Sequence, residues 1–129
     1  MSVQKSIVPE FEITTTTVYV DSESNPEQNY YFFAYKMTIR NQGDTSAQLM
    51  SRHWFITDQY GHVEEVKGPG VVGLQPRILP GQLFEYESAC PLASPSGSMK
   101  GSYFFVGEDG QNFQIDIPEF HLIAPLALH

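Results

Sequence analysis

The stretch Tyr30-Tyr31-Phe32-Phe33-Ala34-Tyr35-Lys36-Met37-Thr38-Ile39-Arg40 decides the fold class of this chain. Side chains alternate between the two faces of a β-strand, so apolar residues at every second position predict a strand with one face on a hydrophobic core. The opposite face becomes polar toward the end of the stretch. The core-facing set is Tyr31, Phe33, Tyr35, Met37 and Ile39.

Similar stretches precede and follow this strand, separated by turn residues, and no window keeps an apolar period of 3.6 over three turns. Ten glycines and nine prolines interrupt the chain. Further strands are expected over 11–20, 48–57, 62–67, 82–89, 99–106 and 112–117, with an edge continuation over 118–122 and loops over 68–81 and 90–97. Seven or eight short strands predict an antiparallel β-sandwich of the immunoglobulin or fibronectin type III kind.

The length of 129 residues and the hydrophobic content of 41% suit a single domain. We expect the sandwich over residues 10–122, an N-terminal extension over 1–9 and a short apolar tail over 123–129. The tail is expected to pack on the sandwich or on a second copy of the chain, which makes a homodimer one of the expected assemblies.

The charge balance excludes some partners. Seven Lys and Arg against 15 Asp and Glu give a net charge of −8, which disfavours binding to the phosphate backbone of nucleic acids. The single cysteine, Cys90, cannot form an internal disulfide and fits a reducing compartment. No signal peptide or membrane-length apolar run is seen, so we expect a cytoplasmic protein without membrane insertion.

The segment Leu49–Asp58 (LMSRHWFITD) and the segment Gly61–Pro76 (GHVEEVKGPGVVGLQP) together resemble the bacterial ApaG family. The resemblance continues through 79–81, 84–88, 95–103 and 117–122. It implies a fibronectin type III-like sandwich and an association with divalent cation resistance or efflux, for cobalt and magnesium. In eukaryotes the same domain is appended to an F-box protein and to a polymerase-interacting protein, which implies a protein-interaction module.

The segment Gly68-Pro69-Gly70-Val71-Val72-Gly73 matches the pattern G-x-G-x-x-G. A dinucleotide site of this kind needs a helix that begins at the glycines, and no helical period follows here. A structural loop is therefore the favoured interpretation, with a backbone anion nest as the alternative. The residues of that alternative phosphate site are Lys67, Gly68, Gly70, Gly73 and Arg77.

A metal site is a further alternative, because His62 and Glu64 would share a face of one strand. Two ligands do not define a site, so solvated strand charges are the favoured interpretation. No complete catalytic constellation is present, and no cofactor is expected. We therefore predict a protein that is not an enzyme.

The preferred function is a non-enzymatic module that binds a protein partner of unknown identity. Trp54 is expected in the core, and the hairpin and glycine loop around it are expected to carry the contacts, because function concentrates in loops. The candidate partner-binding residues are Arg52, His53, Glu65, Gly68, Gly70 and Gly73. The alternative is a small-ligand binder that holds a phosphate-containing ligand or a divalent cation at 68–73.

Overall fold

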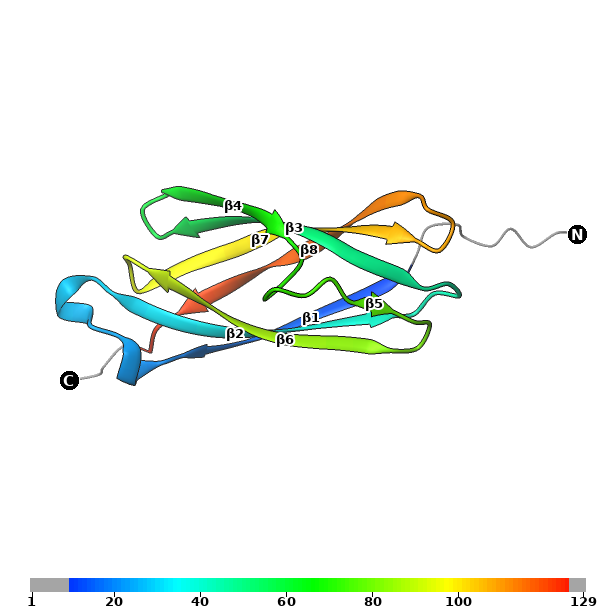
Figure 1. Cartoon of the computed structure of the whole chain (residues 1–129). Helices are drawn as coiled ribbons and strands as arrows, with labels where there is room; N and C mark the ends of the chain where they lie inside the picture. The colour runs from blue at the N-terminus through cyan, green and yellow to red at the C-terminus, as the bar shows by residue number, and fades with distance from the viewer. Residues whose placement is uncertain (1–9, 126–129) are drawn as a thin grey trace, which may run out of the picture.

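A computed structural model describes residues 10–125 as two antiparallel β-sheets that pack face to face (Figure 1). One sheet has the order β1-β2-β6, and the other has the order β4-β3-β7-β8 with β5 paired to β3. The predicted all-β sandwich is confirmed. The strands are β1 (Phe11–Tyr19), β2 (Tyr31–Asn41), β3 (Ala47–Asp58), β4 (Val63–Pro69), β5 (Arg77–Ile78), β6 (Leu83–Leu92), β7 (Ser96–Gly107) and β8 (Asn112–Ile123), with two short 3-10 turns, η1 (Asp21–Glu23) and η2 (Pro26–Gln28).

The alternation in β2 places its apolar face on the core, as predicted. Phe33, Met37 and Ile39 are almost completely buried, whereas Lys36 between them is exposed. β2 is the central strand of its sheet, with β1 on one side and β6 on the other.

Trp54 lies in the core, as predicted, with 4% of its surface exposed. Its ring makes edge contacts with three aromatic rings at centroid distances of 5.8 to 6.3 Å, a geometry that aromatic pairs favour. Those partners come from β2, β7 and β8 and are Tyr35, Tyr103 and Phe120.

The loop predicted over 90–97 is wrong at both ends. β6 continues through Leu92, so Cys90 lies inside a strand and is buried. Proline is tolerated at Pro91 because β6 is an edge strand, where a missing N–H leaves no ladder bond unmade. β7 already begins at Ser96, and Gly97 permits a close backbone approach, since a Cβ there would lie 2.5 Å from the Thr57 carbonyl oxygen.

The predicted loop over 68–81 is also shorter than expected. β4 extends through Pro69, and the two-residue strand β5 pairs with the start of β3. The predicted continuation at 118–122 is confirmed, since β8 runs to Ile123 at the edge of its sheet.

The two long sides of the sandwich differ. On one side β1 packs against the second sheet, where the Phe11 ring lies 4.7 Å from that of Phe105. On the other side β4 and β6 are edge strands of different sheets, and the connection between β4 and β5 crosses the gap between the layers (Figure 1). This second side, between β4 and β6, is called the open side below.

The predicted tail starts against the sandwich. Ala124 is buried, and its N–H donates to the Pro95 carbonyl oxygen at 2.8 Å. The predicted N-terminal extension, 1–9, and the end of the tail, 126–129, lie outside the described residues. Within residues 10–125 no helix has the length and apolar character needed to span a bilayer.

Candidate functional site

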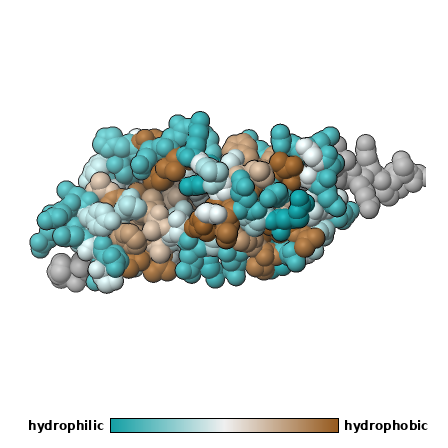
Figure 2. Space-filling view, viewed as in Figure 1, coloured by the Kyte–Doolittle hydropathy of each residue, from teal (hydrophilic) through white to brown (hydrophobic). Residues whose placement is uncertain are grey.

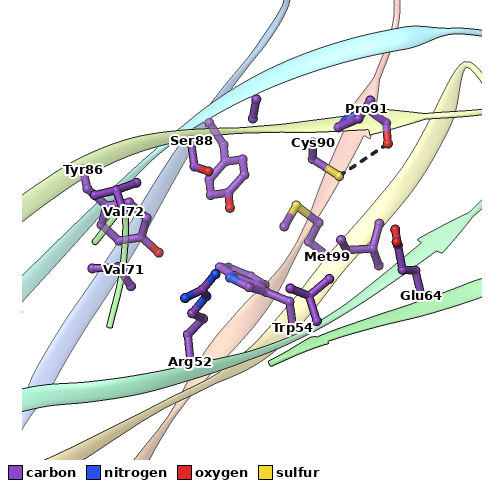
Figure 3. Close-up of a pocket in the computed structure, with 14 residues that line it drawn as sticks. Arg52, Trp54, Glu64, Val71, Val72, Tyr86, Ser88, Cys90, Pro91 and Met99 are labelled. Atoms are coloured by element: carbon purple, nitrogen blue, oxygen red, sulfur yellow. Dashed lines mark hydrogen bonds between the residues drawn. The ribbon is translucent and has the colours of Figure 1, made fainter. Parts of the chain in front are cut away.

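A cavity of about 310 Å³ lies between the sheets at the open side (Figure 3). β3 and β4 form one wall and β6 forms the opposite wall, while Val71 and Val72 of the β4–β5 connection close one end. Two charged side chains, Arg52 and Glu64, are among the lining residues. The size is at the low end of known ligand pockets.

Arg52 enters this cavity from β3. Alternation along the strand places it on the same inner face as Trp54, and Figure 3 shows both pointing into the gap. Its Nη1 donates to the carbonyl oxygens of Pro69 at 2.8 Å and Gly70 at 3.2 Å. The partly buried guanidinium has no carboxylate of residues 10–125 within 4.0 Å.

Gly68 makes room for this side chain. It lies opposite Arg52 in the β3–β4 register, and a Cβ at Gly68 would lie 2.8 Å from Nη1 of Arg52. A larger residue at this position would therefore displace the guanidinium.

A pair of tyrosine hydroxyls lies where the cavity meets the core. The hydroxyls of Tyr86 and Tyr103 are 2.6 Å apart, and within the described chain this is the hydrogen bond that the Tyr103 hydroxyl makes. Tyr103 is fully buried, and a buried donor without an acceptor costs about 1–3 kcal/mol. Tyr103 therefore donates to Tyr86, and the Tyr86 hydrogen turns to the cavity that this residue lines.

Burial raises the pKa values of the tyrosine hydroxyls and of the thiol at this cavity. Desolvation raises the pKa values of Tyr35, Tyr86 and Tyr103 above the ordinary tyrosine value. Desolvation and, to a lesser degree, the nearby Glu64 carboxylate raise the pKa of the Cys90 thiol to about 12. The cavity thus presents neutral hydrogen-bonding groups beside one positive and one negative side chain.

His53 and Glu65 lie on the outer face of the same two strands. The His53 Nε2 contacts Glu65 Oε2 at 2.5 Å, and the His53 ring lies 4.5 Å from that of Phe55. Lys67 Nζ is 3.5 Å from the same carboxylate oxygen. The hydrogen bond with His53, assisted by the charge of Lys67, lowers the pKa of Glu65.

The six candidate partner-binding residues therefore do not form one patch. Arg52, Gly68 and Gly70 lie together around the cavity, whereas His53 and Glu65 are on the far side of the sheet. Gly73 belongs to the turn described next.

The glycine segment is a tight turn, and no helix begins there. Val71 and Leu74 exchange two backbone hydrogen bonds of 2.8 Å around Val72 and Gly73, which have positive φ values of 43° and 80°. The Gly70 N–H donates to the Met50 carbonyl oxygen at 2.8 Å. The N–H groups of Gly70, Val71 and Leu74 thus donate within the chain, which weakens the alternative of an anion nest.

The charged members of that alternative also have other contacts. Lys67 pairs with Glu65, and Arg77 Nη1 donates to Ser46 Oγ at 3.3 Å. The donors of residues 67–77 therefore do not converge on one point, and a phosphate site there stays a prediction.

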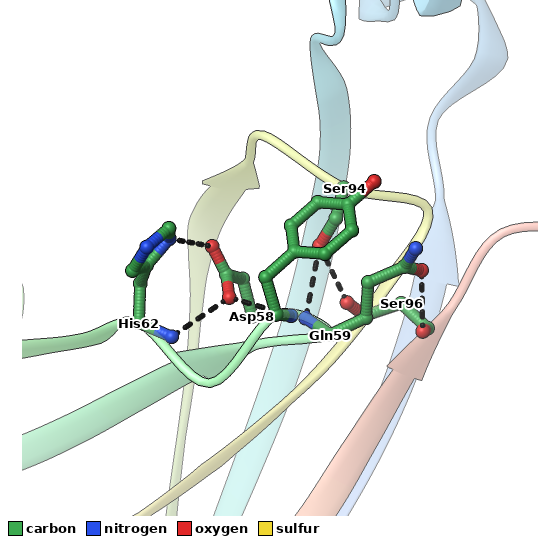
Figure 4. Close-up of polar contacts among 6 residues, drawn as sticks. Asp58, Gln59, His62, Ser94 and Ser96 are labelled. Carbon is green, nitrogen blue, oxygen red and sulfur yellow. Dashed lines mark hydrogen bonds and ion pairs between the residues drawn. The ribbon is translucent and has the colours of Figure 1, made fainter.

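The two candidate metal ligands are separated. His62 lies in the turn before β4, where its Nδ1 is 3.1 Å from Asp58 Oδ2, while Glu64 lines the cavity (Figure 4 shows the turn). Among the described residues, no three His, Cys, Asp or Glu side chains gather in a metal-binding arrangement.

Asp58 instead organises the β3–β4 turn. Its Oδ1 accepts hydrogen bonds from the N–H groups of Tyr60 and His62, both at 2.9 Å. Desolvation acts to raise the pKa of Asp58, but these bonds and the His62 ring outweigh it and hold the pKa below its ordinary value. A second set of bonds, from Gln59 to Ser94 and from Ser96 to Gln59, ties the turn to the β6–β7 connection (Figure 4).

The cavity hydroxyls were not predicted from the sequence, and Glu64 was predicted only as a candidate metal ligand and not as a charged residue of the cavity. A period of two places Tyr35 and Tyr86 on the inner faces of their strands, and a buried tyrosine needs a hydrogen-bond partner for its hydroxyl. Inward tyrosines on two different strands were therefore an available signal of a polar pocket.

Comparison with known proteins gives the family. The ApaG domain matches residues 21–107 of this chain. A protein named ApaG from Bdellovibrio bacteriovorus is 66% identical over 126 residues, which are 98% of this chain and 99% of that protein. Another protein named ApaG, from Azotobacter vinelandii, is 52% identical over 93% of this chain and 95% of that protein. A crystal structure from Bordetella pertussis, 47% identical, matches 92% of this chain and 97% of its own with a TM-score of 0.89. The chain belongs to the ApaG family.

Proposed function

We propose that this chain is a non-enzymatic binding module that receives a protein partner at the open side of the sandwich. One observation carries the proposal: the partly buried guanidinium of Arg52 lines the cavity without a carboxylate partner among residues 10–125. Removing a charge from water is unfavourable unless another charge or hydrogen bonds replace the solvent. An anionic group of the partner would complete this arrangement.

The surface around the cavity also suits a partner. Val72, which lines the cavity, and the nearby Leu74 on the β4–β5 connection are more than half exposed, at 52% and 53%. Apolar surface appears in the band between the two sheets (Figure 2). A contact that covers these side chains would remove apolar area from water, which favours association.

The cavity groups favour binding over acid–base catalysis. The hydroxyls of Tyr35 and Tyr86 and the thiol of Cys90 are protonated near neutral pH even at their ordinary pKa values, and burial raises those pKa values further. A general base must be able to lose its proton near the working pH. These side chains therefore serve as neutral contacts.

Two other roles stay predictions. One is a small-ligand binder that holds a phosphate-containing ligand or a divalent cation at 68–73, and the other is the association with cobalt or magnesium resistance, which rests on the family resemblance alone.

A paired-variant pull-down with quantitative mass spectrometry tests the site. The inner variant combines Arg52→Ala with Glu64→Ala, and the matched outer variant combines His53→Ala with Glu65→Ala on the opposite face of β3 and β4. We expect partners of the wild-type bait to be lost with the inner variant and kept with the outer one. Thermal unfolding of all three proteins controls for folding.

The reverse pattern would place the partner on the outer face and contradict the proposal. Identical partner sets for all three baits would remove both faces of β3 and β4 from consideration.

A further inference from the structure

Resting on this proposed function, we propose that the cavity binds the carboxyl-terminal end of an extended peptide. The terminal carboxylate lies at Arg52, an apolar side chain lies against Trp54, and a basic side chain upstream faces Glu64. Arg52 and Glu64 thus bind opposite ends of a short segment.

The Arg52 end supplies donors for a carboxylate. The guanidinium offers several N–H groups, of which Nη1 is held by the carbonyl oxygens of Pro69 and Gly70. The Tyr86 hydroxyl, whose own lone pair accepts from Tyr103, adds a hydrogen from the opposite wall of the cavity. Arg52 and Tyr86 are close enough for the guanidinium to oppose the rise of the Tyr86 pKa caused by burial.

The Glu64 end lies several residues away. In the β3–β4 register Arg52 is opposite Gly68, and Glu64 is opposite Ile56. Four residues along a strand correspond to about 13 Å. Figure 3 shows Arg52 beside Val71 and Tyr86, and Glu64 on the other side of Trp54 and Met99.

This spacing matches an extended peptide of about four residues, which rises by roughly the same distance per residue as a strand. Apolar side chains between the two charges include Trp54, Val66 and Met99. They suit an apolar residue next to the carboxylate.

A chain terminus fits better than an internal acidic side chain. Val71 and Val72 of the β4–β5 connection lie at the Arg52 end of the cavity, which favours a peptide that ends there over one that continues. The Glu64 carboxylate and the net charge of −8 disfavour a ligand with several negative charges, such as a nucleotide. A peptide with a single terminal carboxylate both ends at Arg52 and carries only one negative charge there.

The test uses NMR titration of the full chain with a synthetic probe, acetyl-Lys-Ala-Ala-Leu, prepared with a free carboxylate and with a carboxamide terminus. We expect shifts of the Trp54 indole signal and binding of the carboxylate form about tenfold or more tightly than the amide. This comparison needs no variant of the protein. The difference should vanish in Arg52→Ala, and Glu64→Gln should reduce the preference for the probe over its Lys→Glu counterpart.

Equal affinities of the two termini, or no shift with either probe at millimolar concentration, would overturn the inference. Hexanoate that binds as tightly as the peptide would identify a small free acid as the ligand and overturn the peptide assignment. If partner capture depends on Arg52 while the two probes bind alike, this inference fails and the proposed function stands. If capture ignores the inner variant, the proposed function itself fails.

Discussion

At the residue scale, the pair Tyr86 and Tyr103 couples the core to the cavity through one hydroxyl contact of 2.6 Å. The two hydroxyls have unequal surroundings, since Tyr103 is fully buried and Tyr86 lines the cavity. The energetic consequence of losing one partner therefore depends on which partner is lost.

Tyr86→Phe is expected to lower the free energy of unfolding by about 1–3 kcal/mol, because it leaves the buried Tyr103 hydroxyl without an acceptor. Tyr103→Phe should cost less, about 0.5–1.5 kcal/mol, since Tyr86 can still reach a cavity water. The double variant should cost less than the sum of the two. Denaturant unfolding of the three variants checks this: additive effects would contradict the contact between the hydroxyls, and a larger loss for Tyr103→Phe than for Tyr86→Phe would contradict the assigned direction of the bond.

Cys90 is expected to be unreactive in the folded protein. With a pKa of about 12 against the ordinary 9.0, its thiolate fraction near neutral pH falls by about a thousandfold. Reaction with a thiol reagent should therefore be slow in buffer and fast after unfolding in denaturant. A thiol that reacts at similar rates in both conditions would show that the residue is not held inside β6.

At the scale of elements, the β4–β5 connection shows how backbone geometry shapes the site. Gly70 has a φ of 59°, and a Cβ there would lie 2.3 Å from the Leu74 carbonyl oxygen. Gly73 has a φ of 80°, but a Cβ there meets nothing within 4 Å. An alanine at Gly73 would therefore meet conformational strain alone, whereas an alanine at Gly70 would meet the same strain and a steric clash.

Gly73→Ala is expected to cost about 1–2 kcal/mol, the strain of a left-handed conformation. Gly70→Ala should cost about 3 kcal/mol or more, because the backbone must also move away from the new methyl group. Thermal and denaturant unfolding of the two matched variants measure the difference. Equal losses would mean that the turn adapts without displacing Leu74.

The strand β6 illustrates a different effect of context. Pro91 suggested the end of an element, yet it occupies an edge strand opposite Phe32 of β2. The position of a strand within its sheet decides whether a proline is tolerated, and that position is set by pairing between distant segments.

At the scale of the whole molecule, burial of titratable groups sets the pH range of stability. The pKa values of Tyr35, Tyr86, Tyr103 and Cys90 are all higher in the folded chain than their ordinary values. A raised pKa means that the folded state holds its proton more tightly than the unfolded state. The stability linked to these groups is present below the ordinary pKa values and is lost as the pH rises through the folded ones.

The denaturant midpoint is therefore expected to fall as the pH rises above about 9 to 10, where the unfolded thiol and phenols begin to ionise. Absorbance of tyrosinate should show three of the seven tyrosines ionising only as the chain unfolds. Tyr86→Phe provides a control with one buried phenol fewer. Ionisation of all tyrosines at the ordinary pKa in folded protein would contradict the burial described here.

The sequence predicted much of the fold because a period of two is a local property of the chain. Alternation in β2 identified the inward residues Phe33 and Met37, and the position of Trp54 between Arg52 and Ile56 identified a core residue. The same alternation separates Arg52 from His53. Grouping them in one patch by their closeness in sequence neglected that neighbours on a strand face opposite sides.

The site depended on distances that no local pattern contains. The cavity exists because β4 and β6 are edges of two different sheets, and because Arg52 pairs in register with Gly68, which has no side chain to displace it. The amino-acid sequence by itself determined the strands, their inward faces and the helix-free glycine turn, since these follow from side-chain alternation and backbone freedom. Only the tertiary structure decided which side of the sandwich stays open and which charges meet there, because sheet pairing between remote segments fixes both.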